Sequence, residues 1–357
     1  MSESLPKPLI LGIESSCDDT ACALVDGEGR VRTSVVSSQL EAHRPWGGVV
    51  PEIASREHLR NWPEVSAEAL ERVGIELGDV DAVAATRGPG LVGSLLVGLS
   101  LGKAIAFALD RPFFAVHHME GHLFSPFLCR NQEEARPAPE RFVGLVVSGG
   151  HSLIVDVAEA GAKIATLAET RDDAMGEVFD KVGKRIGLPF PGGPEVDLLA
   201  EGGDAAAHPM TVAQCGSSLD FSFSGLKSQT LLDLDRLREQ KVSTVVSDEA
   251  PDGQVLDILA GFRASAVAQI LDRLARLHRQ RAISILAVSG GAAANRLLRR
   301  ALEEWADGAG IDLRLVPLVY SGDNAAMIAH AALLRHARGD ADDPRDVDAT
   351  SRLPLER

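Results

Sequence analysis

The sequence predicts an α/β protein built from two duplicated lobes, and three observations support this prediction. The chain has 357 residues, and at roughly 150 residues per domain this length suggests two domains. A set of three short apolar segments separated by polar turns begins near residue 9 and recurs from residue 142. In each half, a later apolar strand leads through a glycine turn into a helix.

The strands of the two repeated sets are predicted at residues 9–13, 21–25 and 31–37, and at 142–147, 153–158 and 164–169. The strand–glycine–helix units lie at 80–109 and 283–306. Glycine is expected in such turns because backbone N–H groups must approach an anionic ligand closely at a helix N-terminus. Two such halves facing a central cleft form the layout of the actin-like ATPase fold, shared by sugar kinases and Hsp70.

Composition and charge limit the classes of function. Hydrophobic residues make up 45% of the chain and charged residues 24%, which is ordinary for a globular protein. The net charge of -15 excludes a free-standing, nonspecific nucleic-acid binder, because the phosphate backbone is repelled. A nucleic-acid substrate then requires a partner protein or a local basic face. Runs of arginine could form such a face, but they are equally typical of ordinary solvated surface helices. The candidate residues for such a face are Arg273, Arg276, Arg279, Arg281, Arg296, Arg299 and Arg300.

Cysteine usage and the N-terminus predict a cytoplasmic protein. The cysteines at positions 17, 22, 129 and 215 show neither a C-x-x-C pair nor zinc-ribbon spacing, and the first residues contain no apolar signal region. Residues 91–109 are apolar and long enough to span a bilayer. Lys103 within them would cost about 2.5–3.5 kcal/mol at a bilayer centre. We therefore predict a buried core helix and no membrane association.

A histidine-rich string, His117-His-Met-Glu-Gly-His122, is the first candidate for chemistry. On a helix, His118 and His122 project from one face, as a metal chelate requires. The alternative is that one histidine caps the helix and the other packs. Glu120 lies about 200° round the helix from His118, so it is poorly placed as the base of a metallopeptidase.

Asp323 stands where a helix is predicted to begin, at about residue 324. It either caps that helix, a role that Asn324 fills equally well, or provides a third metal ligand. Two histidines and a carboxylate make a recurring metal-binding set.

Three further features are candidates for ligand binding. Residues 148–151, Ser-Gly-Gly-His, form either a plain turn with glycine at positive φ or a phosphate- or acyl-binding loop. The loop interpretation is favoured because the matching segment of the first half, residues 14–20, is also polar. Asp180 has apolar helical neighbours that favour a position facing the cleft. Asn295 either caps its helix or contacts a nucleobase or ribose.

Several long strings carry a resemblance to a known family. They are GIESSCDDTACALV, GGVVPEIASREH, TRGPGLVGSLLVG, HHMEGH, LVVSGGHS, FDKVGKRIGLPFPGGPEVDLLA, FSFSGLKSQ and SGGAAANRLLR. Over about residues 10–334, the sequence resembles the tRNA N6-adenosine threonylcarbamoyltransferase family (TsaD), formerly called glycoproteases. Ser321 and Gly322 depart from its pattern, which has Cys-Thr before the Asp-Asn pair, and residues 231–253 resemble a loop insertion.

The resemblance implies a metal-dependent acyltransferase. Its members transfer the L-threonylcarbamoyl group from threonylcarbamoyl-AMP to the exocyclic amine of the adenine next to the anticodon, in tRNAs that read codons beginning with A. The resemblance implies one divalent metal per subunit, Fe²⁺ before Zn²⁺ or Mg²⁺, with His118, His122 and Asp323 as ligands. The implied substrate-binding residues are Val146, Val147, Ser148, Gly149, Gly150, Asp180, Gly193, Asp197 and Asn295.

The general base and the assembly are less closely defined. Glu14 and Asp18 are candidates for the base, and the sequence does not decide between them. The resemblance implies two protein partners besides tRNA, namely a paralogous inactive subunit similar to TsaB and a small ATPase similar to TsaE. We expect an N-terminal lobe over residues 1–112 with the helix at 324–338 packed back on it, a C-terminal lobe over 113–323, and an extended, solvated acidic tail over 339–357.

Three other functions compete with the transferase. A kinase or ATPase of the same fold would phosphorylate an acceptor and would not need His118 or His122. A non-catalytic scaffold would bind nucleotide and organise a tRNA-modifying assembly. A metallopeptidase is disfavoured by the position of Glu120.

Overall fold

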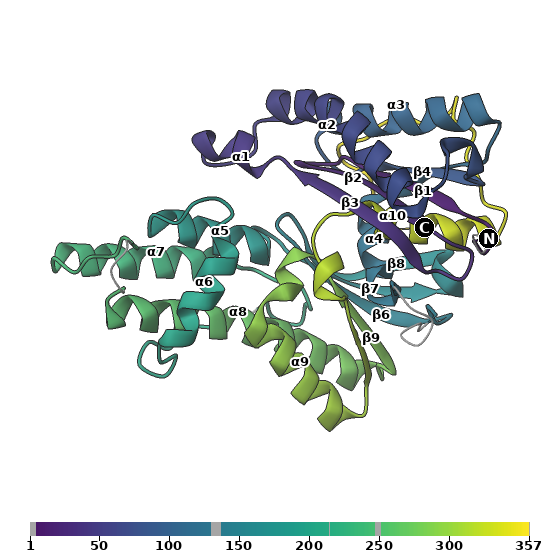
Figure 1. The fold of residues 1–357 in the computed structure, drawn as a ribbon. Coiled ribbons are helices and arrows are strands. Elements are labelled where there is room, and N and C mark those ends of the chain that lie inside the picture. The colour runs from purple at the N-terminus through teal and green to yellow at the C-terminus, as the bar shows by residue number, and fades with distance from the viewer. Residues whose placement is uncertain (1–4, 130–136, 214, 247–250, 357) are drawn as a thin grey trace. The chain divides into compact units, whose positions relative to one another are not determined.

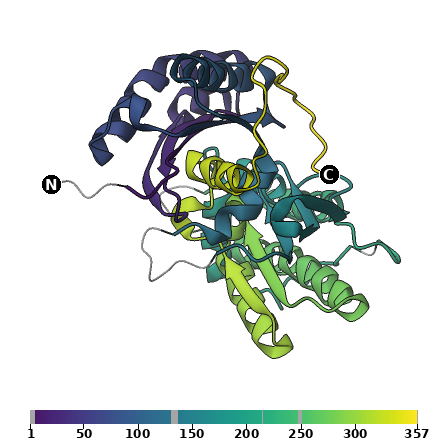
Figure 2. The same ribbon diagram turned by 90° about the vertical axis from the view of Figure 1, so that its right-hand side faces the viewer.

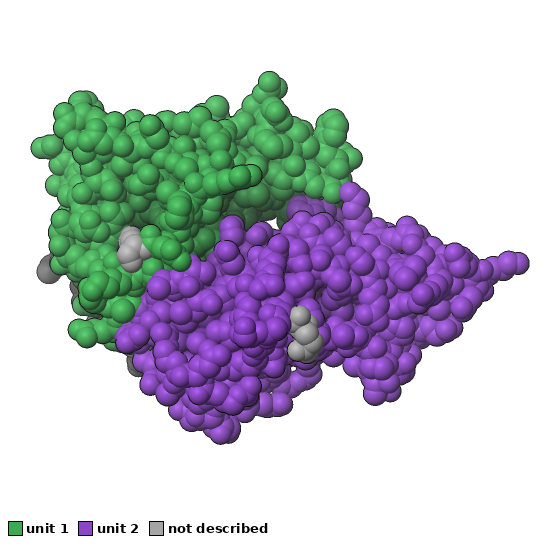
Figure 3. Space-filling model, turned by 180° about the vertical axis from the view of Figure 1, so that it is seen from behind, with its two compact units in different colours: residues 1–140, 158–164, 316–357 green, residues 141–157, 165–315 purple. Residues whose placement is uncertain are grey.

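The computed structural model of the chain describes residues 5–129, 137–213, 215–246 and 251–356. The chain divides into two compact units, which Figure 3 distinguishes by colour. Unit 1 comprises Met1–Glu140, Ala158–Ile164 and Val316–Arg357, and unit 2 comprises Arg141–Val157 and Ala165–Leu315.

Unit 1 contains a five-stranded sheet in the order β3-β2-β1-β4-β5. Figure 1 labels the first four of these strands, β1 to β4. Its strands are β1 (Ile10–Glu14), β2 (Asp19–Val25), β3 (Val31–Ser38), β4 (Ala82–Gly88) and β5 (Phe113–His117). Its α-helices are α1 (Leu40–His43), α2 (Pro51–Val73), α3 (Val92–Leu109), α4 (His118–Phe124) and α10 (Ala325–Ala337). The central strand β1 is antiparallel to β2 and parallel to β4, which is parallel to β5.

Unit 2 is built around a second sheet in the order β10-β9-β6-β7-β8. Its strands are β6 (Phe142–Val147), β7 (Ser152–Ala158), β8 (Lys163–Glu169), β9 (Ile285–Ser289) and β10 (Asp312–Leu315). Its α-helices are α5 (Met175–Arg185), α6 (Gly193–Leu199), α7 (Ser224–Glu239), α8 (Gly253–Gln280) and α9 (Arg296–Ala309). Each sheet thus has one central strand with an antiparallel hairpin on one side and parallel strands on the other. This duplication confirms the predicted α/β architecture, that of the actin-like ATPase fold.

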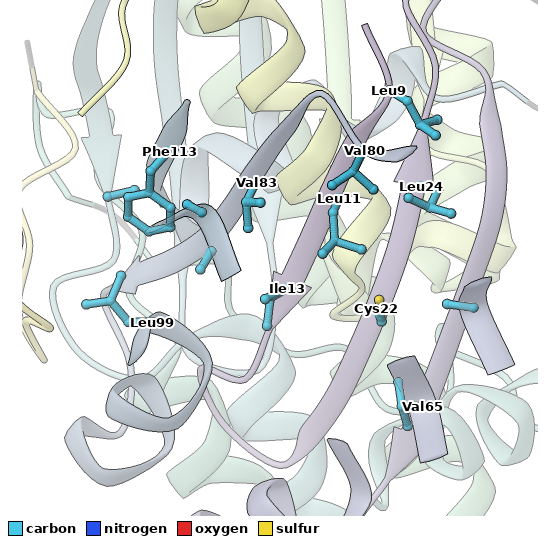
Figure 4. Close-up of a cluster of buried hydrophobic side chains, with 14 of the residues drawn as sticks. Leu9, Leu11, Ile13, Cys22, Leu24, Val65, Val80, Val83, Leu99 and Phe113 are labelled. Carbon is cyan, nitrogen blue, oxygen red and sulfur yellow. The ribbon is translucent and has the colours of Figure 1, made fainter. Parts of the chain in front are cut away.

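Alternation along β1 explains how helices pack on both faces of the sheet in unit 1. Leu11 and Ile13 point toward the side covered by α2 and α3, where they join Leu99 in one buried cluster (Figure 4). Gly12 faces the other way, toward α10. A Cβ at this position would lie 2.3 Å from the carbonyl oxygen of Ala325, so glycine is required for this close approach.

The division between the units differs from the predicted boundary at residue 112. β5 pairs in parallel with β4, with Phe113 opposite Val83, and so belongs to the sheet of unit 1. The first stretch of unit 1 therefore continues to Glu140. The helix expected at about 324–338 is α10, which packs against β1 and β2.

Helix α3 is buried over only about a third of its residues, although its composition predicts a core helix. Its inner face includes Leu95 and Leu99, whereas Val92, Leu96 and Phe107 are 45%, 49% and 83% exposed. Among the described residues, α3 and α8 are long and apolar enough to cross a membrane, which is weak evidence because core helices of soluble proteins share these properties. Two thirds of the apolar window of α8 is buried, against one third of that of α3.

The segment after α10 is bound to unit 1 at several points. Residues 340–353, called the C-terminal strap below, run along unit 1 (yellow in Figure 2). Val347 is 6% exposed and belongs to the core cluster around β1. The acidic composition predicted solvation, but several of these carboxylates are bound within the unit.

Two segments are only partly described. Residues 130–136, which lie between α4 and β6, are outside the described residues. Within 231–253, residues up to Glu239 belong to α7, so this stretch is not a loop throughout, and 247–250 lie outside the described residues.

Candidate functional site

The carboxyl ends of three neighbouring strands bring polar residues together in unit 1. β1 ends at Glu14, Thr86 lies near the end of β4, and β5 runs directly into α4, which begins with His118. These strands are parallel, so their carboxyl ends meet at one edge of the sheet. That edge is where open α/β sheets bind ligands.

His118, His122 and Asp323 form a compact cluster at this edge, with ligand atoms within 4.8 Å of one another. Nε2 of His122 lies 3.1 Å from Oδ1 of Asp323, and Nε2 of His118 lies 3.5 Å from the same oxygen. As the four-residue spacing predicts, both histidines project from one face of α4. Two imidazole nitrogens and a carboxylate oxygen that converge in this way suit a divalent metal ion.

Asn324, rather than Asp323, caps α10. Its Oδ1 accepts a hydrogen bond from the backbone N–H of Met327 at 3.0 Å. Its Nδ2 donates to the carbonyl oxygens of Tyr320 and Gly322 at 3.1 and 2.8 Å. These bonds shape the turn before the helix and leave the Asp323 carboxylate directed at the two histidines.

Glu14 contacts His118 at Nδ1, the ring nitrogen that faces away from Asp323. Its Oε2 lies 3.2 Å from Nδ1 of His118 and accepts a hydrogen bond from Oγ1 of Thr86 at 2.6 Å, and its Oε1 accepts from the backbone N–H of Ser16 at 2.6 Å. A proton on Nδ1 is assigned from this carboxylate contact, so Nε2, which faces Asp323, is the nitrogen that could ligate a metal. Glu14 is fully buried and both of its carboxylate oxygens have partners, which favours a positioning role over the general base considered from the sequence.

The electrostatics of the cluster favour a bound cation. Burial opposes ionisation of Glu14, but the charge of His118 and the hydrogen bonds from His118 and Thr86 outweigh it and hold the pKa of Glu14 below its ordinary value. Burial also disfavours the imidazolium of His118, yet Asp323 and Glu14 raise its pKa to about 9. Burial, together with Asp323, raises the pKa of Asp19 to about 7. This edge of the sheet therefore concentrates negative charge.

A buried histidine outside the cluster holds the β1–β2 turn. Nδ1 of His58, on α2, lies 2.8 Å from Oγ1 of Thr20, and its Nε2 lies 3.0 Å from the carbonyl oxygen of Cys17. The sequence does not indicate a role for His58 or Thr86. Each lies within a string that carries the family resemblance, but no local pattern marks either residue as part of a site.

Unit 2 carries a pocket of about 400 Å³ beyond the carboxyl ends of β6 and β9. Five of the residues implied as substrate-binding line it, namely Gly149, Asp180, Gly193, Asp197 and Asn295. Val146 and Val147 end β6, and Ser148 and Gly150 lie in the following turn, but these four are not among the lining residues. The other lining residues are Met175, Gly176, Phe179, Pro191, Pro194, Gly291, Ala292, Ala294 and Arg296.

Four of the residues that line the pocket are glycines, at positions 149, 176, 193 and 291. A Cβ added to Gly149 or Gly291 would meet no described atom within 4 Å, so these glycines border open space. Gly149 and Gly150 do not have positive φ, so the turn itself does not require them. Gly290 does require glycine, because its φ is 93° and a Cβ there would lie 2.3 Å from the carbonyl oxygen of Val147. The open glycines favour the ligand-binding interpretation of residues 148–151.

Asp197 and Asn295 line this pocket and are hydrogen-bonded to each other. Oδ1 of Asp197 accepts hydrogen bonds from Nδ2 of Asn295 at 2.7 Å and Nη1 of Arg263 at 3.2 Å, and Oδ2 accepts from the backbone N–H of Arg296 at 3.0 Å. Oδ1 of Asn295 accepts from the N–H of Leu298 at 2.8 Å, so Asn295 caps α9. The two side chains join α6 to the N-terminus of α9.

Asp180 is the other acidic side chain of the pocket. Its Oδ1 accepts a hydrogen bond from the backbone N–H of Gly193 at 2.8 Å. Burial raises the pKa of Asp180, against the lowering effect of backbone N–H groups of Gly193 and Gly192. Its carboxylate is thus anchored at one oxygen beside the pocket.

Several arginines considered for a basic face are engaged within unit 2. Arg273 is buried and donates to the carbonyl oxygens of Ala213 and Asp220. Arg281 pairs with Asp156, and Arg296 with Glu201. Arg273 thus lies in the interior of the unit, and the charges of Arg281 and Arg296 are paired with carboxylates.

Comparison with known proteins shows the family. The family model described as tRNA N6-adenosine threonylcarbamoyltransferase (TsaD) matches residues 30–330. A relative of that name from Syntrophobacter fumaroxidans is 45% identical over 354 residues, covering 96% of this chain and 99% of the relative. One from Thermus thermophilus is 43% identical over 348 residues, covering 97% and 99%. The chain belongs to this family of tRNA-modifying transferases.

Solved structures resemble the chain at the level of fold alone. Full-length HypF in its phosphate- and nucleotide-bound form has a TM-score of 0.60 at 14% identity, over 94% of this chain and 47% of that chain. The (R)-2-hydroxyglutaryl-CoA dehydratase component A of Acidaminococcus fermentans has a TM-score of 0.50 at 16% identity, over 92% and 99%.

Proposed function

We propose that the chain transfers the L-threonylcarbamoyl group from threonylcarbamoyl-AMP to the exocyclic amine of the adenine next to the anticodon, in tRNAs that read codons beginning with A. The observation that carries the proposal is the convergence of His118, His122 and Asp323 in a chain of this family. A kinase or a scaffold would not need this donor set.

The pocket of unit 2 suits the adenylate part of the donor. Its volume of about 400 Å³ lies within the range of small-molecule sites. The open space at Gly149 and Gly291 suits a phosphate group, because a residue without a side chain lets an anion approach the backbone N–H groups closely. The carboxylate of Asp180 suits the hydroxyl groups of a ribose.

The reaction exchanges one bond to the carbamoyl carbon for another. The adenine amine forms a C–N bond to this carbon, the C–O bond to the phosphate breaks, and AMP leaves with the electron pair. The amine loses one proton, for which Asp18 is the remaining candidate acceptor from the sequence. Because the adenylate is already activated, we expect positioning to supply much of the rate enhancement.

The histidine–aspartate cluster would hold one divalent metal. Two histidines with one carboxylate are typical of non-haem Fe²⁺, which supports iron before zinc or magnesium. When bound, the metal supplies charge neutralisation and polarisation of the acyl group. Glu14 keeps His118 in the tautomer that the ligand role requires.

We expect the enzyme to act in the cytoplasm with tRNA and two protein partners, the paralogous inactive subunit and the small ATPase. The net charge of -15 supports dependence on a partner for tRNA binding. The exposed apolar side chains Val92, Leu96 and Phe107 of α3 support a protein contact on unit 1.

Mass spectrometry of nucleosides tests the proposal directly. Unmodified tRNA is incubated with the protein, its partners, ATP and threonylcarbamoyl-AMP, using wild type, His122→Ala and the control His336→Ala. We expect threonylcarbamoyladenosine from wild type and control but not from His122→Ala. Product from His122→Ala would remove the metal role. No product from wild type with active partners would overturn the transferase proposal and favour the kinase.

A further inference from the structure

The C-terminal strap begins by covering the open edge of the sheet in unit 1. The backbone N–H of Asp342 donates to the carbonyl oxygen of Phe113 at 2.8 Å, and its Oδ2 accepts from the N–H of Ala115 at 2.7 Å. Arg335 of α10 lies 3.0 Å from the same carboxylate oxygen. The strap thereby satisfies edge groups of β5, the strand that leads into α4.

Further along, the strap packs against the glycine turn that follows β4. The backbone N–H of Thr350 donates to the carbonyl oxygen of Arg87 at 2.9 Å, and the N–H of Gly90 donates to that of Ser351 at 3.4 Å. A Cβ on Gly88 would lie 2.1 Å from the carbonyl oxygen of Thr350. The turn and the strap are therefore fitted to each other, with glycine required at position 88.

The strap ends at the residue that caps the metal-binding helix. The carbonyl oxygen of Leu353 lies 3.0 Å from Nε2 of His117. Nδ1 of the same ring accepts a hydrogen bond from the backbone N–H of Met119 at 3.1 Å, which makes His117 the N-cap of α4.

These two contacts depend on each other through the tautomer of His117. A carbonyl oxygen is only an acceptor, so the contact with Leu353 requires the proton on Nε2. A neutral imidazole then has a lone pair on Nδ1, as the cap requires. The opposite tautomer would place a proton against the N–H of Met119. The strap carbonyl thus selects the tautomer that caps α4.

We propose that the C-terminal strap is a positioning element of the metal site, acting through His117. Helix α4 has only seven residues and carries both His118 and His122, so its first turn sets the direction of both ligands. A distant peptide carbonyl therefore sets metal affinity without touching the ion. This inference rests on the proposed metal-binding role of the cluster.

Two truncations separate the strap end from the residues beyond it. A chain that ends at Ala349 keeps the buried Val347 but loses the Leu353 carbonyl. A control chain that ends at Pro354 keeps this carbonyl as a peptide group. We expect the first truncation to lower Zn²⁺ affinity by roughly 10-fold or more, as loss of a partner behind a metal ligand does. The control should match the full chain. Chelator competition measures affinity, and thermal melting of metal-free protein reports stability.

His117→Asn tests the route through the cap. Asparagine is a good N-cap without tautomers, but its shorter side chain does not reach Leu353. We expect the variant to bind Zn²⁺ nearly as tightly as wild type, and truncation at Ala349 to have no further effect. Failure of this rescue would overturn the His117 route. Equal affinity of both truncated chains would overturn the role of the strap. No Zn²⁺ binding by the full chain would instead overturn the metal proposal itself.

Discussion

The two candidate sites differ in what forms them: polar side chains in unit 1, and glycines that border open space in unit 2. In unit 1, the histidine–aspartate cluster consists of side chains held by other buried side chains, as Glu14 holds His118. In unit 2, four glycines are among the lining residues of the pocket, and those at 149 and 291 border open space. Both lie beyond the carboxyl ends of the central strands of duplicated sheets.

The difference sets which mutations each site tolerates. A side-chain site depends on the identity of hydrogen-bond partners, so even substitutions of equal shape damage it. A glycine-lined pocket depends on open space, so added carbon atoms damage it most. We therefore expect the same fold to provide directional metal ligation in one unit and shape-limited anion binding in the other.

Loss of a metal ligand should have the largest effect. Both His118→Ala and His122→Ala remove one of three donors, so we expect affinity for Fe²⁺ or Zn²⁺ to fall by more than roughly 100-fold. Transfer activity should fall to background. Metal content after dialysis and product by mass spectrometry are the measurements. His336→Ala, on α10, serves as the control, and retention of stoichiometric metal by either ligand variant would argue against the cluster.

The glycine pocket should lose ligand affinity while keeping its stability. A Cβ on Gly149 meets open space, so Gly149→Val should fold normally but obstruct the pocket, weakening AMP binding by roughly 10-fold or more. Gly290→Ala should do the reverse and destabilise unit 2, because its φ is 93° and its Cβ would meet the carbonyl oxygen of Val147. Calorimetry and melting curves on both variants separate the two effects. Unchanged AMP binding by Gly149→Val would show that the adenylate does not bind in this pocket.

Substitution of equal shape should damage the unit 1 site by a smaller amount. Glu14→Gln keeps the volume but offers His118 a neutral partner, so metal affinity should fall by roughly 10-fold. Thr86→Val removes one hydrogen bond to the same carboxylate and should have a weaker effect in the same direction. Chelator competition at fixed pH measures both. Equal metal affinity of Glu14→Gln and wild type would show that the carboxylate charge is dispensable.

Local patterns predicted most of the fold and part of each site. Alternating apolar residues marked the strands, and the four-residue spacing placed His118 and His122 on one helix face. The glycine turns after β6 and β9 marked the pocket. Such features depend on neighbours in the sequence, which a single chain displays.

Contacts between distant segments could not be predicted in this way. Glu14 and His118 are 104 residues apart, so nothing local distinguished a partner behind a ligand from a general base. The acidic tail suggested solvation because its composition does not show that Asp342 binds the edge of β5. The apolar composition of α3 likewise concealed that one of its faces is exposed.

His330 is a second buried histidine of unit 1, and it differs from His118 because no carboxylate of the described residues lies against its ring as Glu14 does against that of His118. Neither ring nitrogen of His330, on α10, has a hydrogen-bond partner within the described part of the chain. Burial lowers its pKa to about 4. In the unfolded chain, His330 binds a proton below about pH 6.5, whereas in the folded chain it stays neutral down to about pH 4. The free energy of unfolding therefore falls as the pH drops from 7 to 5, and His330 contributes about 2 kcal/mol to this fall.

Replacing His330 should therefore remove part of the acid sensitivity. His330→Leu eliminates the titrating group and the buried polar nitrogens, so its unfolding free energy should exceed that of wild type more at pH 5 than at pH 7. Urea denaturation at both pH values measures the difference. A variant whose stability shifts equally at the two pH values would show that His330 does not titrate in this range. His118 provides the contrast: flanked by Asp323 and Glu14, its pKa is raised instead, so two histidines buried in one unit respond to acid in opposite directions.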